Sequence, residues 1–183
     1  MTRQRLPNRR PCVTFDQKVN NIHSLFRHTM EEIGEVATAL SVQAGDKFKS
    51  LTEDSKSEAV DLLLCVASLW FETEVDAEYD WLKLSPSAVF QNLSTEIALA
   101  RIGEFVCKGY VTSYYLKHSP PAIPTSFSHR QAADSYRSAV EYTINLCFNL
   151  GCTAEDIIAV GEVKLNKWLG SVRRKASLAT SEG

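Results

Sequence analysis

Residues 62–71, with the sequence LLLCVASLWF, constrain the fold more than any other part of the chain. If this run is helical, it is apolar on every side, and such a helix is stable only when its neighbours cover its whole circumference. We therefore expect it at the centre of the protein. The predicted core residues are Leu62, Leu63, Val66, Leu69 and Trp70.

Two carboxylates stand at the entrance to this apolar run. Glu58 and Asp61 are three residues apart, so on a helix they project from nearly the same side. Their stripe continues to Cys65 and Ser68, and it contains no basic residue. A buried, unpaired carboxylate is costly, and a bound metal ion is a common remedy. The pattern therefore predicts a metal site at the edge of the core.

A second acidic cluster, Glu31, Glu32 and Glu35, lies on the preceding helical segment. If the two segments pack antiparallel, their carboxylates can surround one point and offer the all-oxygen shell that Mg²⁺ prefers. Taken alone, this cluster fits a solvated face better, because it lies off the apolar stripe of its helix. His28, one turn earlier, can reach the same metal shell, although a solvated or capping histidine is the commoner situation.

Helical periodicity dominates the chain, and strand signals are almost absent. The pattern predicts an all-α bundle of about five helices, over residues 15–43, 52–74, 87–117, 129–150 and 153–172. Gly45 and Gly151 are the predicted helix stops, and Thr52 and Thr153 the predicted N-caps. We expect one all-α domain, with an acid-bearing half and a degenerate second half, between a flexible basic N-terminal arm and a flexible tail. The expected ranges are 1–13 for the arm, 14–172 for the domain (14–84 and 85–172 for its halves) and 173–183 for the tail.

The two halves of the domain share short sequence echoes. Residues 33–36 (IGEV) are matched by residues 102–105 (IGEF), and residues 59–61 (AVD) by residues 139–141 (AVE). In the second copy Arg101 replaces Glu32 and Ser138 replaces Glu58. Either two pseudo-repeated helical hairpins pack together, or an ordinary bundle carries a chance similarity; the sequence leaves both interpretations open.

Composition narrows the classes of function. A net charge of −2 gives no general case for nucleic-acid binding, so no specific nucleic-acid partner is expected. No apolar run approaches the roughly 20 residues of a membrane span, and residues 1–13 lack the apolar stretch of a secretory signal. Five cysteines without a CxxC pair are typical of reduced, structural thiols. We therefore expect a cytoplasmic protein without a membrane partner.

Written as a pattern, residues 31–61 read E-E-x-x-E followed by E-x-x-D. This resembles the signature of the all-α nucleoside triphosphate pyrophosphatases, which include MazG-type enzymes, dCTP pyrophosphatases and dimeric dUTPases. Residues 150–158 and 164–167 are similar to the closing helix of that family. The resemblance implies a MazG-like bundle that cleaves a (deoxy)nucleoside triphosphate into the monophosphate and pyrophosphate. It also implies Mg²⁺, with Mn²⁺ as a substitute, held by Glu32, Glu35, Glu58 and Asp61.

The same resemblance implies further site residues. Glu31 and Glu35 would be catalytic, and the substrate contacts would be Lys164, Asn166, Lys167, Gln17 and Asn20. The family usually spaces the lysine and asparagine of its closing helix more widely than this chain does. Between the two acidic clusters lie Lys47, Lys49 and Lys56, which are usual loop and cap residues; contact with a triphosphate is the alternative role.

Family members associate in pairs, and residues 99–105 present an apolar stripe of Leu99, Ile102 and Phe105. A homodimer or larger homo-oligomer is therefore expected. The alternative to an enzyme is a helical interaction or dimerisation module that keeps a relic metal site.

Overall fold

The fold is helical throughout the part of the chain that the structure describes. The computed structural model describes residues 15–45, 54–73, 93–118 and 125–181, and describes side chains within 21–45, 54–73, 93–114 and 130–167. These residues contain no strand. The five helices are α1 (Phe15–Gln43), α2 (Ser55–Thr73), α3 (Thr95–His118), α4 (Thr125–Asn149) and α5 (Ala154–Ser181). The predicted all-α fold is confirmed.

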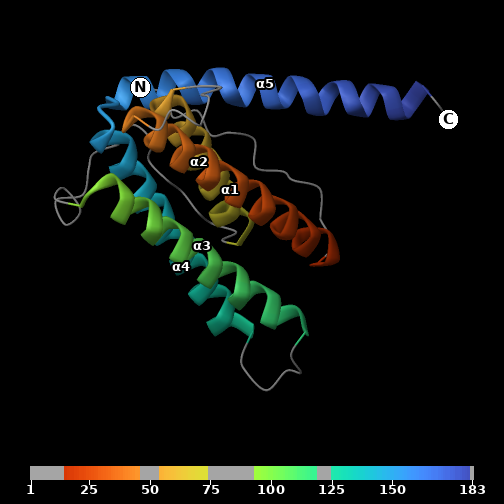
Figure 1. The fold of residues 1–183 in the computed structure, drawn as a ribbon. Coiled ribbons are helices and arrows are strands. Elements are labelled where there is room, and N and C mark those ends of the chain that lie inside the picture. The colour runs from red at the N-terminus through yellow and green to blue at the C-terminus, as the bar shows by residue number, and fades with distance from the viewer. Residues whose placement is uncertain (1–14, 46–53, 74–92, 119–124, 182–183) are drawn as a thin grey trace, which may run out of the picture.

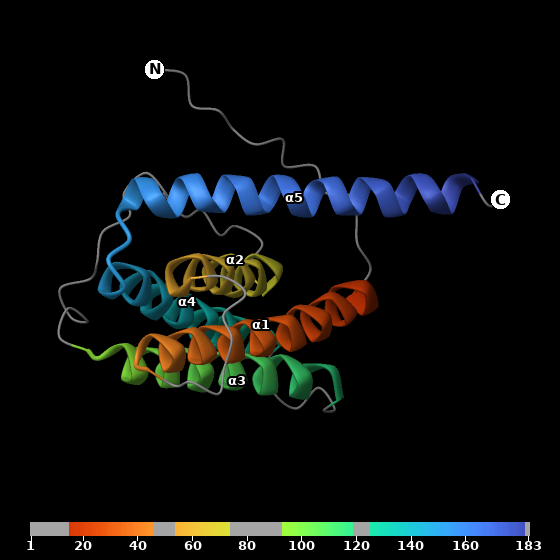
Figure 2. The same cartoon turned by 45° about the horizontal axis from the view of Figure 1, so that its top comes forward.

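The first four helices form a bundle of two antiparallel hairpins, α1–α2 and α3–α4 (Figure 1). The hairpins meet chiefly where α2 packs on α4, and α1 also packs on α3. Helix α5 lies across the bundle on the side of α2, and its C-terminal end extends beyond the other helices (Figure 2). Helix α2 therefore has neighbours on three sides, as its apolar sequence requires.

The core confirms the expectation drawn from residues 62–71. Leu62, Leu63, Val66 and Leu69 are at most 1% exposed, and Trp70 is 5% exposed. Complete burial of such side chains stabilises a fold by roughly 1.5–3 kcal/mol each, relative to leaving them in water. Among the described residues, none of the helices combines the length and the apolar character that crossing a membrane would require.

Helices α3 and α4 approach closely at Gly109. A Cβ added there would lie 2.7 Å from a ring carbon of Tyr136, a side chain with no exposed surface. Only glycine therefore lets the tyrosine ring pack directly on the α3 backbone. This contact fixes the spacing of the second hairpin.

The predicted helix stops agree with the backbone. Gly45 and Gly151 have φ of 99° and 82°, a left-handed conformation that favours glycine at the end of a helix. Thr153 caps α5, because its hydroxyl accepts a hydrogen bond from the Asp156 amide (3.1 Å). The Asp156 carboxylate in turn accepts one from the Thr153 amide (2.9 Å), which completes a capping box.

Four predicted boundaries were wrong. Helix α2 begins at Ser55, with Asp54 as its cap rather than Thr52, which lies outside the described residues. Helix α3 begins at Thr95, later than predicted, because Ser94 caps it, and α4 begins at Thr125, earlier than predicted. Helix α5 continues to Ser181, since the basic and alanine-containing segment that we assigned to a tail has adequate helix propensity. The predicted N-terminal arm, residues 1–13, lies outside the described residues.

The sequence similarity between the two halves extends to buried residues of α2 and α4, but not to the acidic residues. Ala139 and Val140 are fully buried, like Ala59 and Val60. In contrast, Arg101 is exposed and pairs with Glu104 at 2.6 Å, where the first half has the buried Glu32. The two hairpins thus share an arrangement, while the second lacks the acidic pair at these positions.

Candidate metal centre

Three carboxylates meet where α1 and α2 pack together. Glu32 comes from α1, and Glu58 and Asp61 come from the first two turns of α2. Each offers an oxygen within 4.8 Å of those of the other two. Glu58 is 4% exposed and Glu32 is 8% exposed, whereas Asp61 is half-buried. Three of the four predicted metal ligands therefore lie together at the edge of the core.

Glu32 faces α2 because the buried side of α1 is wider than its apolar stripe. It lies between Thr29 and Val36, which have no exposed surface and are neighbours of position 32 on a helix. The hydroxyl of Thr29 donates to the Leu25 carbonyl (2.7 Å), which makes its burial inexpensive. The expectation of a solvated face was wrong for Glu32, whereas Glu31 and Glu35 are exposed.

The start of α2 suits the other two acids. Asp54 caps the helix by accepting a hydrogen bond from the Ser57 amide (2.8 Å), and Glu58 lies in the first turn. Unpaired backbone amides and the helix dipole favour negative charge at this end. The dipole therefore offsets part of the cost of placing Glu58 and Asp61 beside Glu32.

The surroundings of Glu32 are electrostatically unfavourable for its charged form. Its pKa is raised from 4.5 to about 7, chiefly by burial and then by the charges of Asp61, Glu35 and Glu58, against an opposing contribution from His28. Its Oε2 atom is buried and has no hydrogen-bond partner. A buried carboxylate oxygen without a partner is unfavourable unless a proton or a cation meets it.

Helix α5 supplies a cation to the cluster. The Nζ atom of Lys164 forms a part-buried ion pair with the Oδ2 atom of Asp61. The α2 stripe itself has no basic residue, as predicted, but the conclusion that its acids are all unpaired was wrong, because the partner comes from another helix. Lys164, one of the predicted substrate contacts, therefore lies at the acid cluster. Asn166 and Lys167, two other predicted contacts, are exposed.

Two further side chains border Glu32. The Nε2 atom of His28 lies 3.5 Å from the Oε1 atom of Glu32, and its Nδ1 atom lies 3.3 Å from the Oε2 atom of Glu31. Cys65, one turn after Asp61, is 4% exposed, and burial and the nearby carboxylates raise the pKa of its thiol. We had expected a solvated histidine and a structural thiol. The four-residue spacings of His28 from Glu32 and of Asp61 from Cys65 were the signals that could have identified them.

Other predicted site residues lie away from the three carboxylates. Glu35 is exposed and outside the group of oxygens within 4.8 Å, although its charge reaches Glu32. Asn20 lies about 18 Å before Glu32 along α1, and Gln17 lies still earlier; their side chains are outside the described ones. Lys56 donates to the Gly151 carbonyl at 2.9 Å, so it caps the end of α4.

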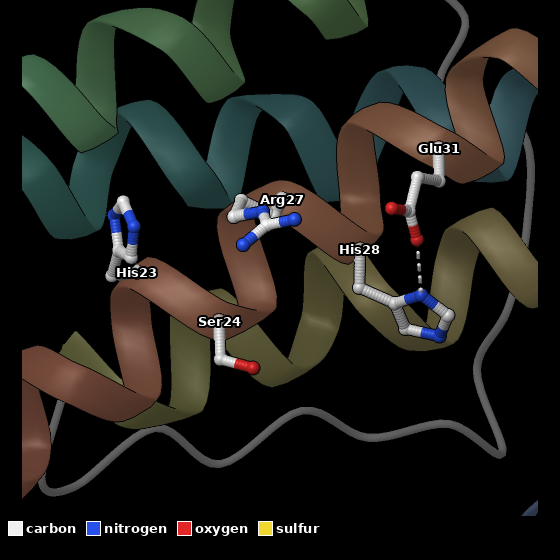
Figure 3. Close-up of a pocket in the computed structure, with 5 residues that line it drawn as sticks. All are labelled: His23, Ser24, Arg27, His28 and Glu31. Carbon is white, nitrogen blue, oxygen red and sulfur yellow. Dashed lines mark hydrogen bonds and ion pairs between the residues drawn. The ribbon is translucent and has the colours of Figure 1, made fainter.

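A shallow depression of about 420 Å³ adjoins the acid cluster. Its described lining comes from one face of α1: His23, Ser24, Arg27, His28 and Glu31 (Figure 3). In Figure 3 the His28 ring turns toward Glu31 along the helix. Because His28 also touches Glu32, it lies between this depression and the buried carboxylates.

Comparisons with protein-family models, with curated proteins and with solved structures found no match to this chain. The resemblance to the pyrophosphatases therefore rests on the acidic residues and their spacing.

Proposed function

We propose that the protein is a Mg²⁺-dependent nucleoside triphosphate pyrophosphohydrolase, which converts a (deoxy)nucleoside triphosphate into the monophosphate and pyrophosphate. The meeting of Glu32, Glu58 and Asp61 at the core edge is the observation that carries the proposal. Three neighbouring carboxylates at the edge of a core are rarely stable without a cation, since both their mutual repulsion and their burial are unfavourable.

The donor set fits Mg²⁺. All three groups offer oxygen, the ligand that hard cations select, and the Oε2 atom of Glu32 is buried without a hydrogen-bond partner. Bound Mg²⁺ would neutralise phosphate charge and activate a water molecule for attack on the α-phosphorus. Glu35 and Glu31, which are exposed near Glu32 on α1, would accept the proton of that water.

Lys164 has two roles in this proposal. Without a metal ion it stabilises Asp61 through their ion pair. In the metal- and substrate-bound state, Asp61 would hold the metal ion and the ammonium group of Lys164 would contact a phosphate. A lysine on a flexible four-carbon side chain can make both contacts from one backbone position.

The proposal extends to partners and location. A nucleoside triphosphate is the substrate. A homodimer remains our expectation from the family resemblance, but the apolar stripe of residues 99–105 does not support it, because Ile102 is buried and Leu99 and Phe105 pack against the core of the same chain. Among the side chains of α3 that the structure describes, the exposed large apolar ones are Ile97, Val111 and Tyr114. A substrate from the nucleotide pool and free thiols at Cys65, Cys107, Cys147 and Cys152 both fit the cytoplasm.

The Lys164–Asp61 ion pair also favours a second candidate, an interaction module with a relic acid site. In that case lysine is the permanent counter-charge, and the cluster binds no metal. The two candidates differ in how the protein responds to a metal ion and a nucleotide.

Thermal melting with Mg²⁺ and a non-hydrolysable dNTP separates them. A ligand at 100 times its Kd stabilises the folded state by about 2.7 kcal/mol. For a chain of this size that corresponds to roughly 5–10 °C in Tm. We expect this shift in the wild type and in Glu141→Gln, which changes an acid of the second hairpin, but not in Asp61→Asn. Equal melting temperatures with and without both ligands would favour the interaction module.

A further inference from the structure

A second set of possible ligands overlaps the acid cluster at Glu32. A nitrogen of His28, an oxygen of Glu32 and the sulfur of Cys65 all lie within 4.8 Å of one another. His28 and Glu32 are one turn apart on α1, and Cys65 faces them from α2. This set differs in kind from the first, because it combines imidazole, carboxylate and thiol.

Glu32 gives independent support for a ligand here. It is more than nine-tenths buried, and its Oε2 atom has no partner among the described residues. Lys164, the cation that α5 brings to the cluster, forms an ion pair with Asp61. The Glu32 carboxylate therefore needs a positive partner that its surroundings supply only in part, through His28.

The contact between Glu31 and His28 prepares the imidazole for metal binding. When the Nδ1–H group donates to the Glu31 carboxylate, at 3.3 Å, the lone pair of Nε2 points toward Glu32. A carboxylate behind a histidine is the usual arrangement at metal-ligating imidazoles, since it fixes the tautomer and the ring orientation. Figure 3 shows this contact on the rim of the depression.

We propose that His28, Glu32 and Cys65 form a site for a borderline divalent transition-metal ion such as Zn²⁺. Thiolate and imidazole select such ions over Mg²⁺, which prefers oxygen ligands. In a tetrahedral site with metal–ligand bonds of about 2.0–2.3 Å, the ligand atoms lie about 3.5 Å apart. The Nε2 atom of His28 is already 3.5 Å from the Oε1 atom of Glu32, and the three ligand atoms lie within 4.8 Å of one another, which would leave a fourth position for water.

Binding releases the proton of the Cys65 thiol, because the thiolate is the metal ligand. The ion enters from the depression on α1, where His28 is half-buried and faces solvent. Since Glu32 belongs to both ligand sets, a Zn²⁺-type ion and Mg²⁺ exclude one another. The expected inhibition of Mg²⁺-dependent turnover by Zn²⁺ rests on the proposed function. The existence of the site formed by His28, Glu32 and Cys65, the mixed site, does not.

Co²⁺ titration of the metal-stripped full-length protein tests the site directly. A Co²⁺–thiolate bond gives a charge-transfer band in the near ultraviolet, which an all-oxygen site lacks. We expect this band to saturate at one ion per chain, to be lost in Cys65→Ser, and to need at least about tenfold more Co²⁺ in His28→Gln. Circular dichroism checks the fold of each variant, and His28→Gln changes a half-exposed side chain that the fold tolerates.

Cys152→Ser is the matched control. A hydrogen bond with Cys147 and the charge of Lys56 lower the pKa of the Cys152 thiol, which makes it the strongest competing thiolate among the described residues. The control should keep the band. No band in the wild type, or a band that survives in Cys65→Ser and is lost in Cys152→Ser, would overturn the proposal.

Competition with Mg²⁺ tests the sharing of Glu32. At Mg²⁺ concentrations that raise Tm, the Co²⁺ titration should shift to higher concentrations in the wild type and stay unchanged in Glu58→Gln. Mg²⁺ that raises Tm but leaves the wild-type titration unchanged contradicts the shared ligand. A Cys65-dependent band in a protein that Mg²⁺ never stabilises supports the mixed site and counts against the proposed hydrolase instead.

Discussion

Replacing Glu32 with glutamine should stabilise the metal-free protein. The change keeps the size of the side chain but removes the charge that burial and the nearby acids oppose. The pKa of Glu32 is about 7 in the folded state against 4.5 as its ordinary value. At 1.36 kcal/mol for each tenfold change in proton affinity, this difference corresponds to about 3 kcal/mol.

The gain depends on pH in a defined direction. Below pH 4.5 the carboxyl group is protonated in both the folded and the unfolded state, so its titration contributes no penalty. Between pH 4.5 and about 7 the unfolded state releases the proton first, and the stability of the wild type falls. Above pH 7 the penalty is complete, and Glu32→Gln should exceed the wild type by up to about 3 kcal/mol. This equals roughly 6–12 °C in Tm.

Urea unfolding followed by circular dichroism, with a chelator present, measures this difference at pH 5 and pH 8. Glu35→Gln is the matched control, because it removes the same charge from an exposed position one turn away. It should relieve only part of the repulsion on Glu32 and give a much smaller gain. The reasoning is refuted if Glu32→Gln gains no more stability at pH 8 than at pH 5, or if Glu35→Gln matches it.

Two other substitutions test the ion pair at the site and the packing of α3 on α4. Lys164→Met loses a part-buried ion pair and should cost about 1–3 kcal/mol in urea unfolding, whereas Lys167→Met, at an exposed position, should be nearly neutral; equal effects would contradict the ion pair. Gly109→Ala forces a methyl group into the ring of Tyr136 and should lower stability by about 1–2 kcal/mol after the gain in helix propensity. Gly103→Ala, which meets no atom within 4 Å, should instead gain roughly 0.5–1 kcal/mol, and thermal melting compares the two.

The sequence was sufficient for the architecture because the relevant signals are local. The apolar run of residues 62–71 required a central helix, and Gly151 and Thr153 marked the junction between α4 and α5 through their own backbone and side-chain chemistry. The spacing of Glu58 and Asp61 placed them on one side of α2 for the same reason. Such features depend on residues within one helical turn.

The parts that were missed depend on contacts between distant segments. Lys164 is 103 residues from Asp61, and no periodicity relates them. Glu32 lies off the apolar stripe of α1, so its burial appears only when α2 is packed against it. The end of α5 was missed because its last turns have no apolar stripe, and the start of α3 because a serine cap, Ser94, was not distinguished from its neighbours.

Product analysis in a pyrophosphate-release assay tests the central claim most directly. Purified protein is incubated with Mg²⁺ and a panel of canonical and modified dNTPs, and the products are separated. We predict monophosphate and pyrophosphate from at least one substrate, and loss of that activity in Asp61→Asn and Glu58→Gln. Glu104→Gln, which changes an exposed acid of the second hairpin, should keep it. Release of a nucleoside diphosphate and orthophosphate would contradict the proposed site. So would the absence of turnover with every substrate, or an equal loss of activity in Asp61→Asn and Glu104→Gln.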